Sequence, residues 1–134
     1  SVPYEQLLPS GVYDGLLITV QGVVNPDAEL FAINLHRNED IALHINPRFN
    51  ESPAVIVRNS LIDNTWGTEE RDCPTFPFAQ GQPFDVQILC TTDAFKVSAN
   101  NTYLLEYNHR IPELSEIGRL SVLGGVTLQY VNTV

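Results

Sequence analysis

Short segments in which apolar and polar residues alternate recur along this chain, and they limit its fold more than any other feature. Residues 31–36 (Phe-Ala-Ile-Asn-Leu-His) are an example, because every second side chain is large and apolar. A period of two places those side chains on one face of an extended strand, where they can face a core. Turn pairs such as Asp14-Gly15 and Asn25-Pro26 separate the segments, and no long stretch has the period of a helix. The pattern predicts an all-β fold, an antiparallel two-sheet sandwich of about eleven short strands.

The expected strands can be placed from the alternation and from the turns between them. They are residues 16–24, 31–36, 41–49, 54–60, 65–71, 84–90, 94–99, 103–107, 120–123 and 126–130, preceded by a short edge strand within residues 1–11. Residues 73–78 contain two prolines and are expected to form an irregular edge, and residues 112–117 one short helical turn. The 134 residues can bury one core but are too few for two, so we expect a single domain spanning residues 1–134.

The charge balance excludes several classes of partner. Seven basic residues stand against sixteen acidic ones, which gives a net charge of −9 and a pI near 4.5. Nucleic acid and anionic membrane surfaces would both be repelled by this excess of negative charge. No apolar run approaches the length of a membrane span, and no signal peptide is visible at the N-terminus. We therefore expect neither nucleic-acid binding nor insertion into a membrane.

The two cysteines, Cys73 and Cys90, are too few to form a disulfide framework. Reduced thiols are the favoured interpretation, and one disulfide between them is the alternative. A metal site made from these cysteines and two of the three histidines would lack the close pair of ligands typical of such sites. We expect no metal and no cofactor.

One predicted strand carries a row of polar side chains. In Leu43-His44-Ile45-Asn46-Pro47-Arg48-Phe49 the side chains of His44, Asn46 and Arg48 point one way, while Ile45, Pro47 and Phe49 point the other. An imidazole, an amide and a guanidinium on one face can donate and accept hydrogen bonds at a shared ligand. The row is expected to form an exposed polar surface on a hydrophobic support.

Trp66 is the only tryptophan, and its neighbours decide how it is interpreted. A lone tryptophan in a β-protein is usually part of the core. Here it lies between Asn64-Thr65 and Gly67-Thr68, with charged residues following, and we predict that its indole is exposed. An exposed indole offers a flat apolar face that suits the C–H face of a sugar ring.

Glu69 and Arg71 are expected on the same face of their strand, with Glu70 on the other. Arg48 and Arg71 can both reach Glu69, which would fix this carboxylate as an acceptor for sugar hydroxyls. The alternative is an ordinary surface ion pair, worth about 0–1 kcal/mol. Asn59 adds an amide that can donate and accept. The residues together predict a sugar-binding site.

Several spaced motifs resemble those of the galectins. They are His44-x-Asn46-Pro47-Arg48-Phe49, Val57-x-Asn59, Trp66-Gly67-x-Glu69-x-Arg71, Pro77-Phe78-x-x-Gly81-x-x-Phe84, Phe95-x-Val97, His109-Arg110-Ile111-Pro112 and Gly124-Gly125-Val126-Thr127-Leu128. The resemblance extends over the whole chain. It implies a jelly-roll sandwich of the galectin and concanavalin type, and a single carbohydrate-recognition domain that binds β-galactosides without metal or catalysis.

The resemblance also assigns roles to seven residues. It implies that His44, Asn46 and Arg48 hold the 4-hydroxyl of galactose and that Asn59 and Glu69 hold the 6-hydroxyl. Trp66 would stack under the ring. Arg48, Glu69 and Arg71 would reach the neighbouring glucose or N-acetylglucosamine.

Three positions depart from the family pattern or fit the predicted fold poorly. The turn at residues 50–54 is shorter than in several members, which affects preference among extended glycans. Gly125 replaces a common aspartate. Arg58 alternates toward the interior, and we expect its guanidinium to reach an edge and pair with a carboxylate.

Two other classes of function are alternatives to a lectin. A glycoside hydrolase needs two carboxylates across the bond, whereas Glu69 would be flanked by arginines and Glu70 points away, so we expect no enzyme activity. The second alternative is a galectin-like structural or self-associating protein with weak or altered sugar binding. The presence of all seven site residues argues against it.

The expected partners are β-galactoside glycans on glycoproteins or glycolipids, such as lactose and N-acetyllactosamine types. Crosslinking them requires at least two sites, through a homodimer or a second linked galectin domain, and the sequence favours neither. The family implies export without a leader, hence both cytoplasmic and extracellular locations. Such export would leave the two sequons at Asn50 and Asn100 without glycans.

Overall fold

Eleven β-strands and one short 3-10 turn form the structure, a computed structural model that describes all residues from Ser1 to Val134. The elements are β1 (Tyr4–Leu7), β2 (Leu17–Val24), β3 (Phe31–Arg37), β4 (Asp40–Arg48), β5 (Val55–Ile62), β6 (Thr65–Trp66), β7 (Pro83–Cys90), β8 (Ala94–Ala99), β9 (Thr102–Asn108), η1 (Leu114–Glu116), β10 (Arg119–Gly124) and β11 (Val126–Thr133).

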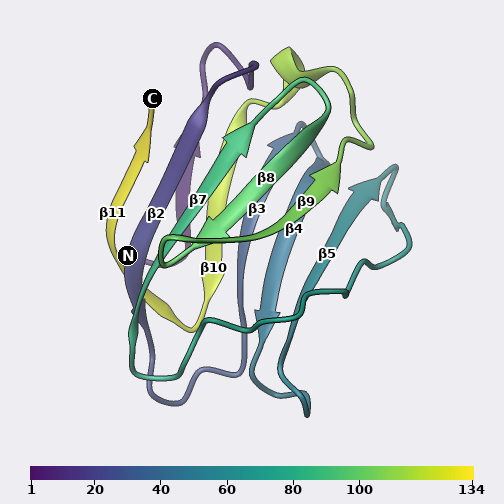
Figure 1. Ribbon diagram of the computed structural model, residues 1–134. Coiled ribbons are helices and arrows are strands. Elements are labelled where there is room, and N and C mark those ends of the chain that lie inside the picture. Colours follow the sequence, from purple (N-terminus) through teal and green to yellow (C-terminus); the bar gives the residue numbers. More distant parts are fainter.

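The strands form two antiparallel sheets that pack face to face (Figure 1). One sheet has the order β1-β10-β3-β4-β5-β6 and the other the order β11-β2-β7-β8-β9. A single cluster of 29 buried apolar residues fills the space between them. The predicted all-β, antiparallel two-sheet sandwich is confirmed. No helix of the structure has the length and apolar character needed to span a membrane.

Alternation along β3 explains how the core forms. Phe31, Ile33 and Leu35 are almost wholly buried, whereas His36 at the end of the strand is only partly covered. Asn34 points to the opposite side of the strand and is nevertheless buried, because polar side chains of β4 and β10 cover it. The outer face of this sheet is therefore a packed polar layer rather than a fully solvated one.

A cluster of phenylalanines anchors one end of the sandwich. The ring centroids of Phe31 and Phe84 lie 5.2 Å apart, and Phe78 meets Phe31 edge to face at 5.4 Å. Phe49 and Phe76 meet in the same way, also at 5.4 Å. Such pairs stabilise a core beyond the area that they bury. This cluster ties the turn after β4 and the irregular segment after residue 72 to the core.

The predicted strand at residues 65–71 is mostly wrong. Only Thr65 and Trp66 pair with β5, and the chain then leaves the sheet until a single bridge joins Glu70 to Arg58. The reason is local: the amide of Gly67 still donates to the carbonyl of Ser60, as in a continued ladder, but the side chain of Asn59 takes the place of the reciprocal bond, since it accepts from the amide of Ser60 and donates to the carbonyl of Gly67. The last strand is longer than predicted, because its pairing with β2 continues to Thr133.

Other expectations are confirmed. Residues 73–78 form no strand, and the 3-10 turn η1 falls within residues 112–117. Arg58 does reach a carboxylate at the sheet edge, since its Nη2 lies 3.1 Å from Oδ1 of Asp72. Both cysteines are free thiols, and burial raises the pKa of Cys90 to about 12.

Candidate functional site

The polar row of β4 lies on the outer face of the six-stranded sheet, with the core on the opposite side of the strand. His44 stands opposite Asn59 of β5, and Asn46 stands opposite Val57. Trp66 follows at the sheet edge, where it pairs with Leu61. Three adjacent strands, β4, β5 and β6, therefore bring these side chains together although they are up to 22 positions apart in the sequence.

An open groove of about 360 Å³ lies over these strands. Its lining residues are His44, Arg48, Val57, Asn59, Trp66, Gly67 and Glu69. Five of the seven predicted site residues line it. The other two, Asn46 and Arg71, do not, and both instead contact residues that do.

Trp66 forms one wall of the groove. Its side chain is 47% exposed, as predicted from its polar neighbours. The indole lies 4.9 Å from the imidazole of His44, with the two rings tilted by 54°. The rings therefore do not stack on each other, and the indole face stays available to a ligand.

His44 is held by a hydrogen bond that fixes its tautomer. Its Nδ1 lies 2.6 Å from Oδ1 of Asn34, which can only accept. Nδ1 therefore carries the proton, and the neutral ring keeps an acceptor at Nε2. Burial lowers the pKa of His44 to about 4, and the positive charge of Arg48 acts in the same direction.

Asn46 is almost completely buried, at 4% exposed, and acts from beneath the groove. Its Nδ2 donates to the carbonyl of Phe31 at 2.8 Å, which fixes the amide orientation. Its Oδ1 accepts from Nε of Arg48, also at 2.8 Å. Asn46 therefore orients Arg48 toward the groove.

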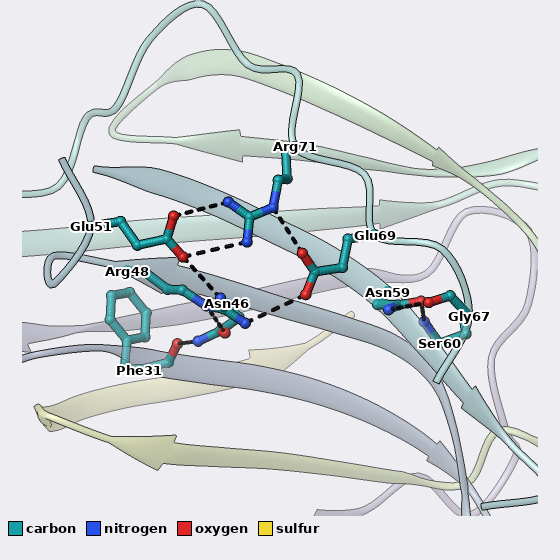
Figure 2. Close-up of polar contacts among 9 residues, drawn as sticks. All are labelled: Phe31, Asn46, Arg48, Glu51, Asn59, Ser60, Gly67, Glu69 and Arg71. Atoms are coloured by element: carbon teal, nitrogen blue, oxygen red, sulfur yellow. Dashed lines mark hydrogen bonds and ion pairs between the residues drawn. The ribbon is translucent and has the colours of Figure 1, made fainter. Parts of the chain in front are cut away.

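Two arginines and two glutamates alternate in a cluster beside the groove (Figure 2). Arg71 donates from Nε to Glu69 at 2.8 Å and from Nη1 to Glu51 at 2.9 Å. Arg48 donates from Nη1 to Glu51 at 3.0 Å, and its Nη2 lies 3.7 Å from Glu69. The predicted flanking of Glu69 by both arginines is confirmed. The four charges cancel, so the cluster offers fixed donors and acceptors without a net charge.

Glu51 was not predicted to belong to this cluster. It lies in the turn after β4, and its hydrogen bonds with Arg71 and then Arg48 lower its pKa. Pairing with Glu51 and then Glu69 raises the pKa of Arg71. Glu51 stands three positions after Arg48, a spacing that could have drawn attention to it, but strand alternation carries no information about a turn.

Asn59 has a defined orientation as well. Its Nδ2 donates to the carbonyl of Gly67 at 2.8 Å, and its Oδ1 accepts from the backbone amide of Ser60 at 2.8 Å. No group of three or more His, Cys, Asp or Glu side chains in the structure could hold a metal ion. The groove consequently offers a ligand oriented hydrogen-bonding groups and an aromatic plate.

Comparison with known proteins places the chain. A model of the galactoside-binding lectins matches residues 3–133. The chain belongs to the galectin family. Galectin-3 of Mus musculus is 47% identical over 133 residues, which cover 98% of this galectin chain and 50% of that protein. Galectin-3 of Oryctolagus cuniculus is 48% identical over 128 residues, which cover 95% of the chain and 52% of that protein.

Solved structures agree with this assignment. Chicken galectin 2 has a TM-score of 0.87 at 34% identity, with 98% of each chain covered. Caenorhabditis elegans galectin LEC-6 has a TM-score of 0.91 at 22% identity, covering 100% of this chain and 91% of that one, a likeness of fold. The galectin chain spans about half the length of the curated relatives that it matches.

Proposed function

We propose that this galectin binds β-galactosides of the lactose and N-acetyllactosamine type, carried on glycoproteins or glycolipids. One observation supports the proposal most strongly. The exposed indole of Trp66 and the oriented polar groups of His44, Arg48, Asn59 and Glu69 line the same open groove. An apolar plate beside a set of donors and acceptors matches the two kinds of surface on a galactose ring.

The axial 4-hydroxyl of galactose fits the polar row of β4. Nε2 of His44 can accept its proton, while the guanidinium of Arg48 can donate to its oxygen. Glucose carries this hydroxyl equatorially, pointing away from the row. A lost partner costs about 1–3 kcal/mol for each buried group left unpaired, so galactose is preferred over glucose.

The 6-hydroxyl fits between Asn59 and Glu69, while the C–H face of the ring covers Trp66. The second sugar of the disaccharide then extends over the arginine–glutamate cluster (Figure 2). Arg48, Glu69 and Arg71 are the residues of this cluster that we assign to it. Because the cluster is held by ion pairs before any ligand arrives, little side-chain entropy is lost on binding.

Binding is proposed to leave the glycosidic bond intact. Hydrolysis requires one carboxyl group that donates a proton and a second that acts as nucleophile or base. Glu51 and Glu69 both accept hydrogen bonds from Arg71, the pairing with Arg71 and then Arg48 lowers the pKa of Glu51, and Glu70 pairs with Arg110 away from the groove. Lactose incubated with the protein should therefore release no galactose.

Retention on lactose-agarose tests the proposal directly. The chain should bind the matrix and be eluted by lactose but not by an equal concentration of glucose. Failure to bind, with the fold intact by circular dichroism, would favour the structural or self-associating alternative. Precipitation of a multivalent glycoprotein tests the further proposal that a multivalent form crosslinks glycoconjugates.

A further inference from the structure

We propose that Arg110, which lies outside the groove, is a positioning residue that limits Asn59 to the role of hydrogen-bond donor. This inference rests on the proposed function and deepens it, because it identifies what sets recognition at the 6-hydroxyl. Arg110 follows β9 and comes 51 positions after Asn59 in the sequence. Its charged group nevertheless lies directly behind the groove wall.

The guanidinium of Arg110 is fixed from several sides. Nη1 donates to Oδ1 of Asn59 at 2.8 Å, and Nη2 donates to the carbonyl of Thr68 at 2.8 Å and to Oε2 of Glu70 at 2.9 Å. The group also lies 4.9 Å from the centre of the Tyr107 ring, in a cation–π contact. The ring of Tyr107 is itself fully buried. The core thus fixes the position of Arg110 on one side, through Tyr107. The segment that follows Trp66 fixes it on the other, through Thr68 and Glu70.

These contacts settle what Asn59 can offer a ligand. Its Oδ1 accepts from both the Ser60 amide and Arg110, which occupies the two lone pairs of a carbonyl oxygen. One hydrogen of Nδ2 is used by the carbonyl of Gly67. The only unused group is the second hydrogen of Nδ2. The sequence suggested an amide that donates and accepts, but the packed geometry leaves a donor alone.

A donor at Asn59 completes a directional site. A sugar hydroxyl between the two residues accepts from Asn59 and donates to Glu69, which can only accept when charged. Turning the amide around would set its NH₂ group against two donors, one of them charged. Hydrogen bonds to charged groups are the stronger ones, so Arg110 contributes most to holding this orientation.

Gly67 leaves room for this arrangement. A Cβ atom at this position would lie 2.7 Å from Nη1 of Arg110 and 3.2 Å from Oδ1 of Asn59. A side chain here would therefore displace the guanidinium from the amide. Gly67→Ala consequently tests the contact without removing the charge.

The test compares two sugars in the full chain by titration calorimetry: lactose, and lactose that lacks the galactose 6-hydroxyl. The wild-type protein should prefer lactose about tenfold or more. Arg110→Met should weaken lactose binding about tenfold while weakening the deoxy sugar much less, so that the preference falls at least about threefold. Gly67→Ala should reduce the preference in the same direction, and Arg110→Lys should lie between Arg110→Met and the wild type.

Arg37→Met is the matched control. Arg37 is similarly covered and pairs with the carboxylates of Asp40, Glu113 and Glu116, away from the groove. It should leave both affinities unchanged. In the sugar-free protein, the side-chain amide signals of Asn59 should be sharp in the wild type and exchange-broadened in Arg110→Met.

The outcomes separate the two proposals. The role of Arg110 is overturned if neither Arg110→Met nor Gly67→Ala changes the ratio of the affinities for the two sugars. This holds even if both affinities fall, provided that they fall equally. If Arg110→Met fails to fold, Gly67→Ala decides. Wild-type protein that binds neither sugar overturns the proposed function itself, and that result needs no variant.

Discussion

The Nδ1 atom of His44 on β4 lies 2.6 Å from Oδ1 of Asn34 on β3. Asn34 in turn donates to the hydroxyl of Ser121 on β10 at 3.3 Å, and that hydroxyl lies 2.7 Å from Nε2 of His36. A hydrogen-bonded chain thus crosses three strands beneath the outer face of the sheet. The chain ends at the groove with the bond between Nδ1 of His44 and Oδ1 of Asn34. This bond leaves Nε2 as the nitrogen of His44 that can accept from a ligand.

Replacing Asn34 with Leu should weaken lactose binding about tenfold, because the acceptor that fixes the His44 tautomer is lost. Asn34→Asp is the matched variant, since a carboxylate still accepts from Nδ1, and it should retain more of the affinity. Calorimetric titration with lactose measures both. Equal losses in the two variants would mean that the tautomer does not matter for binding.

The affinity for lactose should fall at low pH, when His44 becomes protonated. The pKa of His44 is lowered to about 4 by burial and by the charge of Arg48, so the ring is neutral at physiological pH. Protonation would put a hydrogen on Nε2 and remove the acceptor. Affinity should hold down to roughly pH 5 and then fall up to tenfold per unit below the pKa. A midpoint near 6.5 would contradict this assignment.

The same shift makes a prediction about stability. The folded-state pKa of His44 lies below the unfolded value of 6.5, so the unfolded chain binds the proton first as the pH falls. The contribution of neutral His44 to the free energy of unfolding is fully present above pH 6.5 and is lost as the pH drops from 6.5 toward 4. Urea unfolding of wild type and His44→Gln across this range isolates the effect, and parallel curves would count against it.

Trp66→Ala should abolish retention on lactose-agarose, because an aromatic anchor in a binding site typically contributes about 2 kcal/mol or more. The fold should stay cooperative, since the indole is half exposed on a two-residue edge strand. Lys96→Ala is the control: Lys96 lies on the other sheet in an exposed 3.7 Å pair with Glu106, and its loss should be silent. Unchanged lactose affinity in Trp66→Ala would contradict stacking.

Glu51→Gln should loosen the cluster that faces the second sugar. Arg71 would keep one charged partner, Glu69, and Arg48 would lose its closest one. We expect lactose to bind roughly 3–10-fold more weakly, with a smaller loss for methyl β-galactoside, which lacks the second ring. Titrations with both sugars give the ratio. A uniform loss would place Glu51 at the galactose rather than beside its neighbour.

Alternation predicted which residues share a face but not which distant residues meet there. It placed His44, Asn46 and Arg48 together, because strand geometry alone decides that. It could not find Glu51, which lies in a turn, or Arg110, which follows a strand of the other sheet and donates to Asn59 of β5. It also extended β6 too far, since the Asn59 side chain that bonds to the backbone of Ser60 and Gly67 and interrupts the ladder leaves no trace in the hydrophobic pattern. Contacts across the fold depend on topology, which a single strand does not encode.

Arg58 provides a test of how a buried charge is tolerated. Its side chain is 2% exposed and its Nε has no hydrogen-bond partner, while its carboxylate partner Asp72 is 98% exposed. The guanidinium also donates to the carbonyls of Ile56 and Asp72. The ion pair therefore adds little, and most of the contribution of Arg58 comes from packing and from satisfying two backbone carbonyls.

Arg58→Ala should lower the free energy of unfolding by about 2–4 kcal/mol, because it leaves a cavity and a buried carbonyl without a donor. Arg58→Met keeps most of the volume but also leaves the carbonyl of Ile56 without a donor, so it should cost about 1–2 kcal/mol, less than Arg58→Ala. Asp72→Asn should change stability by less than about 0.5 kcal/mol. Urea unfolding measures all three, and lactose binding should be unaffected because Arg58 points away from the groove. If Arg58→Met proved as unstable as Arg58→Ala, the hydrogen bonds that the guanidinium donates, and not its packing, would be what holds this edge of the sheet.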